Sequence, residues 1–251
     1  MKFLFNEILY RPMLNLLFFL YNNIWADLGV AIILLTLIIR FVLLPVFYKS
    51  AKDQTIMQKI APKIKEIQET HKNDKEKQVK EIMNIYKEHK VNPFSGFALL
   101  FIQLPFLIAL YQVFLRGLGS NLSDFLYSFV AVPSQINYHF LGLIQLNQKN
   151  IILVLIASVF QYLQTYLLMK VAQKNNTNKK TEGGINDIAQ RMGKQMMYIG
   201  PAFTFLILYS LPSAVSLYWV TTSVFSVVQQ IFINKSIEKN GQDIPKIANA
   251  N

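Results

Sequence analysis

Long apolar runs alternate with short polar stretches along most of this 251-residue chain. Most runs approach the roughly 20 residues that cross a hydrocarbon core about 30 Å thick, and in water-free lipid only helices satisfy their own backbone there. We therefore predict five transmembrane helices, at residues 27–48, 93–116, 151–171, 197–211 and 213–234. The fourth run is the shortest. Because Pro212 leaves almost no loop between the last two runs, they should form a tight hairpin.

Residues 49–92 are highly charged, yet they keep apolar residues at helical spacing in two sets. Asn73 and Asp74 lie between the sets as a turn, and Pro62 is expected in the first turn of the first helix. The two sets are Ile60, Ile64 and Ile67, then Val79, Ile82, Met83 and Tyr86. The pattern predicts an antiparallel helical hairpin outside the membrane. A solvated linker is the alternative, but linkers rarely keep such periodicity.

Residues 1–26 are apolar but interrupted by polar side chains, and their leucines and phenylalanines, beginning with Phe5, recur near helical spacing. This pattern is typical of an amphipathic helix at the membrane interface. A cleaved signal peptide is the alternative, with Lys2 as its basic start, but no small-x-small cleavage site follows the leucines.

Three further polar segments separate or follow the apolar runs. Residues 117–150 carry few charges and scattered aromatics, which predicts short interfacial helices outside the cell. Residues 172–196 contain an Asn-, Lys- and Gly-rich centre and are predicted to be a flexible cytoplasmic loop. Residues 235–251 form a short polar cytoplasmic tail.

Composition supports a membrane protein, because 53% of the residues are hydrophobic and only 16% are charged. The net charge of +11 comes from lysines and arginines that lie between apolar runs rather than in a patch interleaved with aromatics. That arrangement predicts contact with anionic lipids and argues against specific nucleic-acid recognition.

Lysine and arginine counts also predict the topology. Residues 48–92, 170–196 and 235–251 hold 11, 6 and 3 of these residues, whereas 1–27 and 116–150 hold two each. By the positive-inside rule the first three segments are cytoplasmic, which places the N-terminus outside and the C-terminus inside.

The sequence contains few residue patterns that are typical of catalytic sites or metal sites. The chain has no cysteine, and its three histidines lie far apart in polar or loop sequence. No nucleophile–base pattern lies in the predicted spans. We therefore expect no cofactor, no metal site and no enzymatic activity.

Arg40 is the one formally charged residue in the five apolar runs inside these spans, which are Leu28–Phe47, Phe94–Leu115, Ile151–Met169, Met197–Leu211 and Ser213–Ile233. At 1.5 Å per residue it lies roughly 10 Å from the cytoplasmic end of its helix, where a charge costs about 2.5–3.5 kcal/mol on insertion scales. Its side chain could snorkel to the headgroups. The functional alternative is a water-filled, positively charged groove inside the bundle.

Other polar residues at membrane depth would suit such a groove, although each alone could be interhelical glue. They are Gln103 in the second span, Gln161 and Gln164 in the third, and Thr221, Thr222, Ser223 and Ser226 in the fifth. No carboxylate lies within the five apolar runs, which argues against a proton-coupled pump.

Four sequence segments resemble the YidC/Oxa-type membrane protein insertases. They are LTLIIRFVLLPVF with the charged KSAKDQTIMQKIAPKIKEIQ, then NPFSGFALLFIQLPFLIALYQVF, YLQ at 162–164, and LPSAVSLYWVTTSVFSVVQQ at 211–230. Their order and the predicted topology both match the family. The resemblance covers nearly the whole chain from Leu28 to Lys235.

The resemblance implies an all-α membrane protein with five transmembrane helices around a hydrophilic groove, a cytoplasmic helical hairpin and an N-terminal interfacial helix. The family's groove arginine corresponds to Arg40, its third-span glutamine to Gln164 and its fifth-span aromatic to Trp219. Family behaviour implies a bacterial cell-membrane protein whose partners are nascent membrane proteins and, in some members, the Sec translocon and the ribosome.

The chain departs from the family pattern in three respects. It has neither a large extracytoplasmic domain nor a lipidated cysteine, its tail carries only three lysines, and Thr221 and Thr222 stand where amides are frequent. A transporter should show internal repeats or broken helices, and neither is visible. An assembly factor without insertase activity is not separable from an insertase by sequence.

Overall fold

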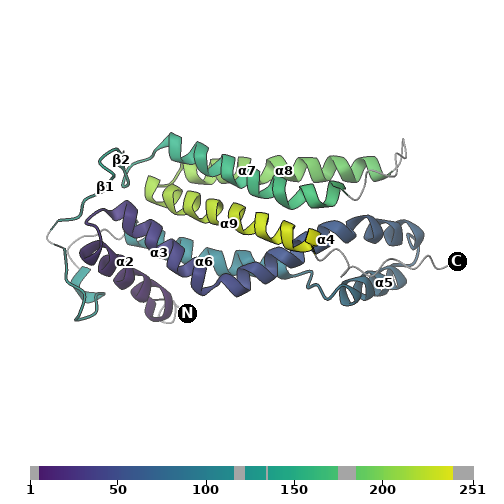
Figure 1. Ribbon diagram of the computed structural model, residues 1–251, viewed down its shortest axis with the longest axis horizontal. Helices are drawn as coiled ribbons and strands as arrows, with labels where there is room; N and C mark the ends of the chain where they lie inside the picture. The colour runs from purple at the N-terminus through teal and green to yellow at the C-terminus, as the bar shows by residue number, and fades with distance from the viewer. Residues whose placement is uncertain (1–5, 116–121, 134, 175–184, 240–251) are drawn as a thin grey trace.

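The computed structural model describes residues 6–115, 122–133, 135–174 and 185–239. Phe5 and Lys2, the centre of the predicted cytoplasmic loop and the tail from residue 240 lie outside these ranges. The described part is predominantly helical, as the hydrophobic pattern predicts. Most helices lie along one long axis, with α4 and α5 at one end and α2 and the strands at the other (Figure 1).

The most apolar helices are α3 (Leu28–Val42), α6 (Ser95–Leu115), α7 (Ile151–Lys174), α8 (Ile185–Tyr209) and α9 (Ser213–Lys239). Helix α9 is central, because it contacts α3, α4, α6, α7 and α8. By length and composition two described segments could cross a membrane, Ile151–Lys170 and Ser213–Ile237. A third qualifies when α3 and α4 count as one span bent by 71°, and Met197–Tyr209 is a shorter apolar helix.

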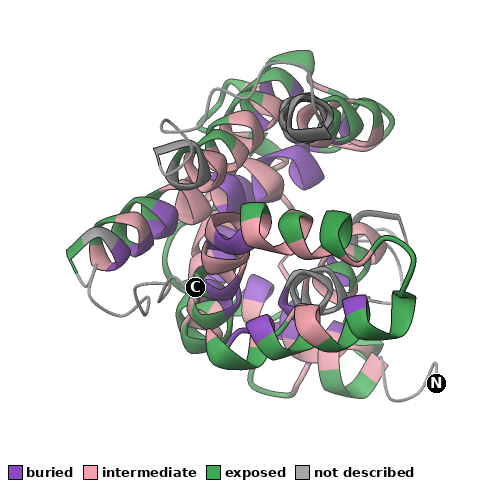
Figure 2. Ribbon diagram, turned by 90° about the vertical axis from the view of Figure 1, so that its right-hand side faces the viewer, coloured by how far each residue is buried: buried purple, intermediate pink, exposed green. Residues whose placement is uncertain are grey.

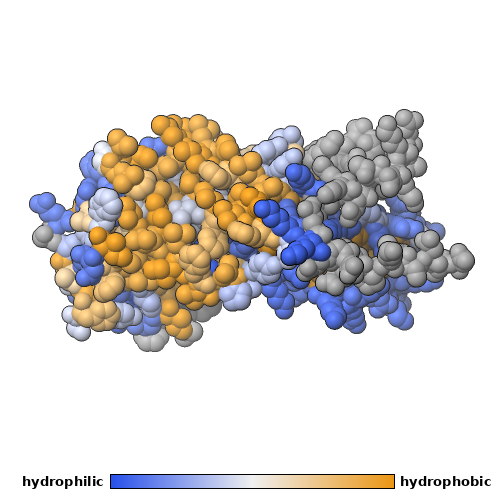
Figure 3. All heavy atoms as spheres, in the orientation of Figure 1, coloured by the Kyte–Doolittle hydropathy of each residue, from blue (hydrophilic) through white to orange (hydrophobic). Residues whose placement is uncertain are grey.

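The distribution of hydrophobic residues on the surface agrees with these candidate membrane spans. Hydrophobic residues cover the part of the molecule where α3, α7, α8 and α9 lie, whereas the end that carries α4 and α5 is hydrophilic (Figure 3). From that end, buried positions gather between the helices and exposed positions face outward (Figure 2).

Helix α4 (Leu44–Thr70) differs from the prediction for the cytoplasmic hairpin. It begins directly after the bend at Leu43 and runs through Pro62, so the prediction that Pro62 marks a helix start is wrong. Pro62 is exposed, and water can therefore reach the carbonyl that its missing N–H leaves free. The predicted antiparallel partner is present as α5 (Lys75–Glu88), and Ile60, Ile85 and Val91 form their shared core.

Helix α8 also begins earlier than its apolar run. It includes Ile185–Lys194, part of the stretch predicted to be a loop, because hydropathy marks the membrane-crossing part of a helix and not its full length. Residues 175–184, the centre of the predicted loop, are not described.

At the other end, a π-helical turn (η1, Asn6–Tyr10) precedes α2 (Arg11–Asn23). The helix predicted for residues 1–26 is therefore present in the described range. Its apolar side packs inside the protein, with Leu14, Leu17 and Phe18 fully buried beside α3. Its position at a membrane interface stays a prediction.

The segment between α6 and α7 corrects another expectation. Its described residues hold one 3-10 turn (η2, Leu122–Asp124) and two short antiparallel strands, β1 (His139–Phe140) and β2 (Ile144–Gln145), instead of several interfacial helices. Side chains of α2 form hydrogen bonds with backbone groups of this segment. Asn15 bonds to Phe125 and Tyr127, and Tyr21 bonds to Gln135 and Asn137.

Candidate functional site

Arg40 lies near the C-terminal end of α3 and is buried, with only 6% of its surface exposed. Its guanidinium carbon is 4.2 Å from the centre of the Phe47 ring on α4 and 5.9 Å from that of Phe225 on α9. A ring face attracts a cation, and this attraction is stronger away from water. The side chain therefore points into the protein rather than along the lipid-facing surface.

Two polar side chains from other helices connect to Arg40. Its Nη2 donates to Oε1 of Gln103 on α6 at 3.5 Å, and Nε2 of Gln103 donates to the hydroxyl of Tyr218 on α9. The cation is thus linked to three neighbouring helices through neutral or aromatic groups. The salt bridges found among the described residues are Arg11–Glu7 and His71–Glu81, so no described carboxylate neutralises Arg40.

Further polar groups are buried on α6 and α9. The atoms Gln112 Oε1, Ser216 Oγ, Thr222 Oγ1 and Gln229 Oε1 have no hydrogen-bond partner among the described residues. Thr222 follows Tyr218 by one helical turn and therefore lies on the same side of α9. Buried polar atoms are normally paired, so these four atoms leave hydrogen-bonding capacity unused among the described residues.

The remaining predicted residues are more scattered. Gln161 and Gln164 are half-buried on α7, and no hydrogen bond to Arg40 is found for either within the described residues. Trp219 packs with Phe205 and Leu211 in a cluster between α7, α8 and α9. Ser226 is half-buried, one turn beyond Thr222. The structure therefore brings Arg40 and Gln103 together and leaves the grouping of the others as a prediction.

Three side chains around Arg40 were not predicted from the sequence. Tyr218, Phe47 and Phe225 were not among the candidates, although Tyr218 stands in the Leu-Tyr-Trp element. Spacing could have found it, because Tyr218, Thr222 and Phe225 follow the i, i+4, i+7 pattern of one helix face.

A second polar network holds α4 against the bundle. Gln230 on α9 donates to Thr55 on α4 at 2.9 Å and to Asn234, which in turn donates to the Leu167 carbonyl of α7 at 2.9 Å. The Ser95 hydroxyl at the start of α6 donates to the buried Asp53 carboxylate at 2.7 Å. These contacts fix the bend that follows Arg40.

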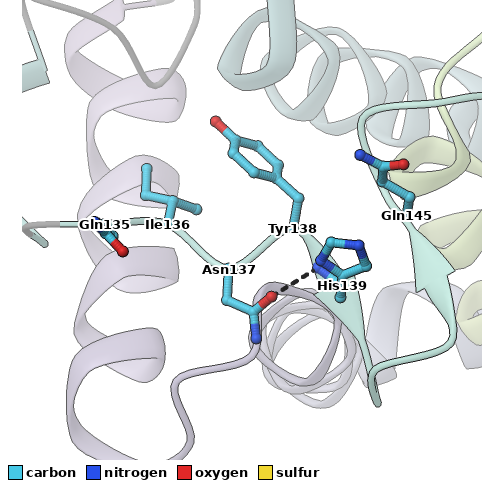
Figure 4. A pocket seen from close by; sticks show the side chains of 6 residues that line it. All are labelled: Gln135, Ile136, Asn137, Tyr138, His139 and Gln145. Carbon is cyan, nitrogen blue, oxygen red and sulfur yellow. Dashed lines mark hydrogen bonds between the residues drawn. The ribbon is translucent and has the colours of Figure 1, made fainter.

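A small hollow of about 370 Å³ lies elsewhere, on the segment that carries β1 and β2. Its lining residues are drawn in Figure 4: Gln135, Ile136, Asn137, Tyr138, His139 and Gln145. Burial, and secondarily the neighbouring Tyr21, raises the pKa of Tyr138, so its hydroxyl stays protonated. The hollow contains none of the predicted groove residues. No group of three or more potential metal ligands occurs in the described ranges.

Comparison with known proteins gives a consistent result. The sequence model of the family described as 60Kd inner membrane protein matches residues 19–240. A membrane protein insertase YidC of Fusobacterium nucleatum is 32% identical over 210 residues, which cover 84% of this chain and 87% of that relative.

Two further relatives carry the same name. The protein of Geobacter sulfurreducens is 30% identical over 227 residues, and that of Oceanobacillus iheyensis is 29% identical over 212 residues. The aligned part covers 37% of the Geobacter protein and 74% of the Oceanobacillus protein. The chain therefore spans little more than a third of several of its relatives and most of others.

Proposed function

This chain belongs to the 60Kd inner membrane protein family, and we propose that it is a membrane protein insertase whose groove is built around Arg40. The observation that carries the groove is a buried cation with no described acidic partner. A buried charge normally needs a partner or contact with water, because desolvation is costly. A groove open to water meets this need and keeps the cation available for a substrate.

The proposed groove lies among the five predicted spans. Arg40, Gln103 and Thr222 line it from α3, α6 and α9, with Tyr218 holding Gln103 beside the cation. Gln161, Gln164, Trp219 and Ser226 contribute from α7 and α9. The unpartnered polar atoms of α6 and α9 support this assignment, because water or a polar peptide would satisfy them.

Insertion by this groove requires no covalent step. A short polar segment of a nascent membrane protein enters from the cytosol, and an acidic segment is attracted to Arg40. Neutral amides such as Gln103 form hydrogen bonds with this segment. Replacing these bonds by hydrogen bonds to water costs little free energy, so the segment is held only briefly. The apolar helix that follows moves into lipid, and the burial of its surface drives the process.

The proposed location is the bacterial cell membrane, with the N-terminus outside and the C-terminus in the cytosol. Lysine-rich α4 and α5 would then lie in the cytosol, near anionic lipid headgroups and emerging chains. The ribosome and the Sec translocon are proposed as partners at that end.

Photo-crosslinking tests the proposal. A photo-reactive amino acid replaces Gln103, or as a control Ile152, which is 61% exposed on α7. Proteoliposomes receive a nascent single-span client with a short acidic N-terminal tail. The proposal expects crosslinks between the tail and position 103, none from position 152, and client insertion above that in empty vesicles. Equal insertion with and without the protein would contradict it.

A further inference from the structure

The turn between β1 and β2 has an unusual residue for its shape. Leu141 and Gly142 both have positive φ angles, +50° and +72°, and the Leu143 N–H donates to the Phe140 carbonyl across the turn. A β-turn whose two central residues both have positive φ favours Asn-Gly or Asp-Gly, because Asn and Asp tolerate the left-handed region better than Leu. Local conformation therefore does not explain the leucine.

Burial within the protein does not explain it either. Leu141 is 56% exposed and Leu143 is 85% exposed. The neighbouring linker between α2 and α3 also carries large exposed apolar residues, Ile24 at 59% and Trp25 at 62%. Several apolar side chains thus project from one end of the molecule.

The turn that carries these leucines and its two strands form hydrogen bonds with the starts of two helices. The Leu141 N–H donates to the Asp27 carboxylate at 2.7 Å, and that carboxylate also caps α3 through the N–H groups of Gly29 and Val30. On the other side, the Ser213 hydroxyl donates to the Gln145 carbonyl at 2.7 Å, and the Ala214 N–H donates to the Leu146 carbonyl at 3.0 Å. The turn is therefore held beside the first residues of α3 and α9.

This attachment sets the level of the turn relative to the membrane. Helices α7 and α9 begin at Ile151 and Ser213, and both are long and apolar enough to cross a bilayer. Exposed apolar residues continue from Ile151, Ile152 and Leu155 along α7. The turn thus lies at the same end of the molecule as the starts of α7 and α9 (Figure 1). If these helices cross a bilayer, the turn is at the level where the hydrocarbon meets the headgroups.

We propose that the β1–β2 turn is a lipid anchor, in which Leu141 and Leu143 enter the headgroup–acyl boundary beside Trp25. Tryptophan is enriched at this boundary, because its ring combines an apolar body with a polar N–H. A lipid partner accounts for an exposed leucine in a left-handed position, where a water-facing turn would carry Asn. The anchor does not depend on the function proposed for Arg40.

Tryptophan fluorescence in reconstituted vesicles tests this anchor. The chain has two tryptophans, so Leu143→Trp is made in a Trp25→Phe, Trp219→Phe background, and Trp25 is also read alone in Trp219→Phe. Lipids brominated near the headgroup end or near the methyl end of the acyl chains act as quenchers, and acrylamide reports water exposure. Asn73→Trp in the same background is the water-exposed control.

We expect Leu143→Trp and Trp25 to emit at shorter wavelength than Asn73→Trp and to lose most emission with the shallow brominated lipid, less with the deep one and little with acrylamide. Adding Leu141→Asn, which suits the turn but not lipid, should reduce lipid quenching at position 143. Acrylamide quenching of Leu143→Trp equal to that of Asn73→Trp would overturn the proposal. Protection of Leu143→Trp from both lipid and acrylamide would also overturn it, because protein would then cover the turn.

Discussion

The Arg40 side chain is the residue on which the functional account depends. Its guanidinium is buried between the rings of Phe47 and Phe225 and touches Gln103, while no described carboxylate approaches it. Aromatic faces and one amide at 3.5 Å compensate a cation less completely than a carboxylate does. In the proposed mechanism, the charge is therefore available to an incoming acidic group.

Substitutions of Arg40 should separate clients by the charge of their translocated tail. Two unit charges roughly 10 Å apart at an effective dielectric constant near 20 attract by about 1.7 kcal/mol. Arg40→Ala should thus reduce insertion of an acidic-tailed client roughly tenfold, since 1.4 kcal/mol is a factor of ten. Arg40→Lys should retain most activity, and Arg40→Glu should be the least active. The measurement is protease protection of the client in proteoliposomes.

A client with an uncharged tail serves as the control for this series. Its insertion should change much less between wild type and Arg40→Ala. An equal loss for acidic and uncharged tails would show that Arg40 supports the fold and not the attraction of charge.

At the residue scale the sequence identified part of the site. Arg40 stands out because a charge inside an apolar run is costly, and that reasoning needs no structure. The role of Tyr218 was not predicted, because a tyrosine in an apolar helix is equally consistent with packing. Which side of α9 faces α3 is decided by tertiary contacts, and such contacts also decide the apolar neighbours of Trp219.

At the element scale, apolar runs predicted the long helices but not their ends. Helix α4 continues through Pro62 because Phe47, Thr55 and Ile60 bury it against its neighbours, and tertiary packing outweighs one missing hydrogen bond. The strands β1 and β2 were missed because they are two residues long and depend on contacts with Asp27 and the start of α9.

Close packing between α3 and β1 gives a second prediction. A Cβ added to Gly29 would collide with the side chain of Phe140. Gly29→Ala should therefore lower the free energy of unfolding by about 1–3 kcal/mol, as overpacking usually does. Thermal unfolding in detergent measures this loss.

The double variant Gly29→Ala, Phe140→Ala is the matched test of this clash. Removing the ring should recover part of the loss relative to Phe140→Ala alone. Gly200→Ala is the control, since among the described residues no atom beyond the adjacent residues and backbone of its own helix lies within 4 Å of a Cβ added there. If Gly29→Ala and Gly200→Ala behave alike, α3 does not pack against β1 as described.

At the scale of the whole molecule, the two ends differ in character. The α4–α5 end is hydrophilic and lysine-rich, whereas the opposite end carries β1, β2 and α2 (Figures 1 and 3). The positive-inside rule assigns the lysine-rich end to the cytosol. The positions of the lysines in the sequence predicted that the two ends differ in charge. The arrangement of the helices around α9 depends on packing between helices, which the sequence of one helix alone does not determine.

Protease sites test this orientation directly. A site inserted after Lys75 should resist protease added outside intact cells, because the start of α5 is predicted to be cytosolic. A site after Asn147, an exposed residue beside β2, should be cut. Cleavage at the first site and protection of the second would reverse the topology.

The most direct test of the central claim measures whether water reaches Arg40 from the cytosol. The natural chain has no cysteine, so single cysteines can be placed at 40 and 164, with the more exposed neighbours Ile38 and Leu163 as matched lipid-facing controls. A membrane-impermeant thiol reagent is applied to the cytosolic side of sealed vesicles. We expect labelling at positions 40 and 164 and protection at positions 38 and 163. Protection at positions 40 and 164 would contradict a water-filled groove.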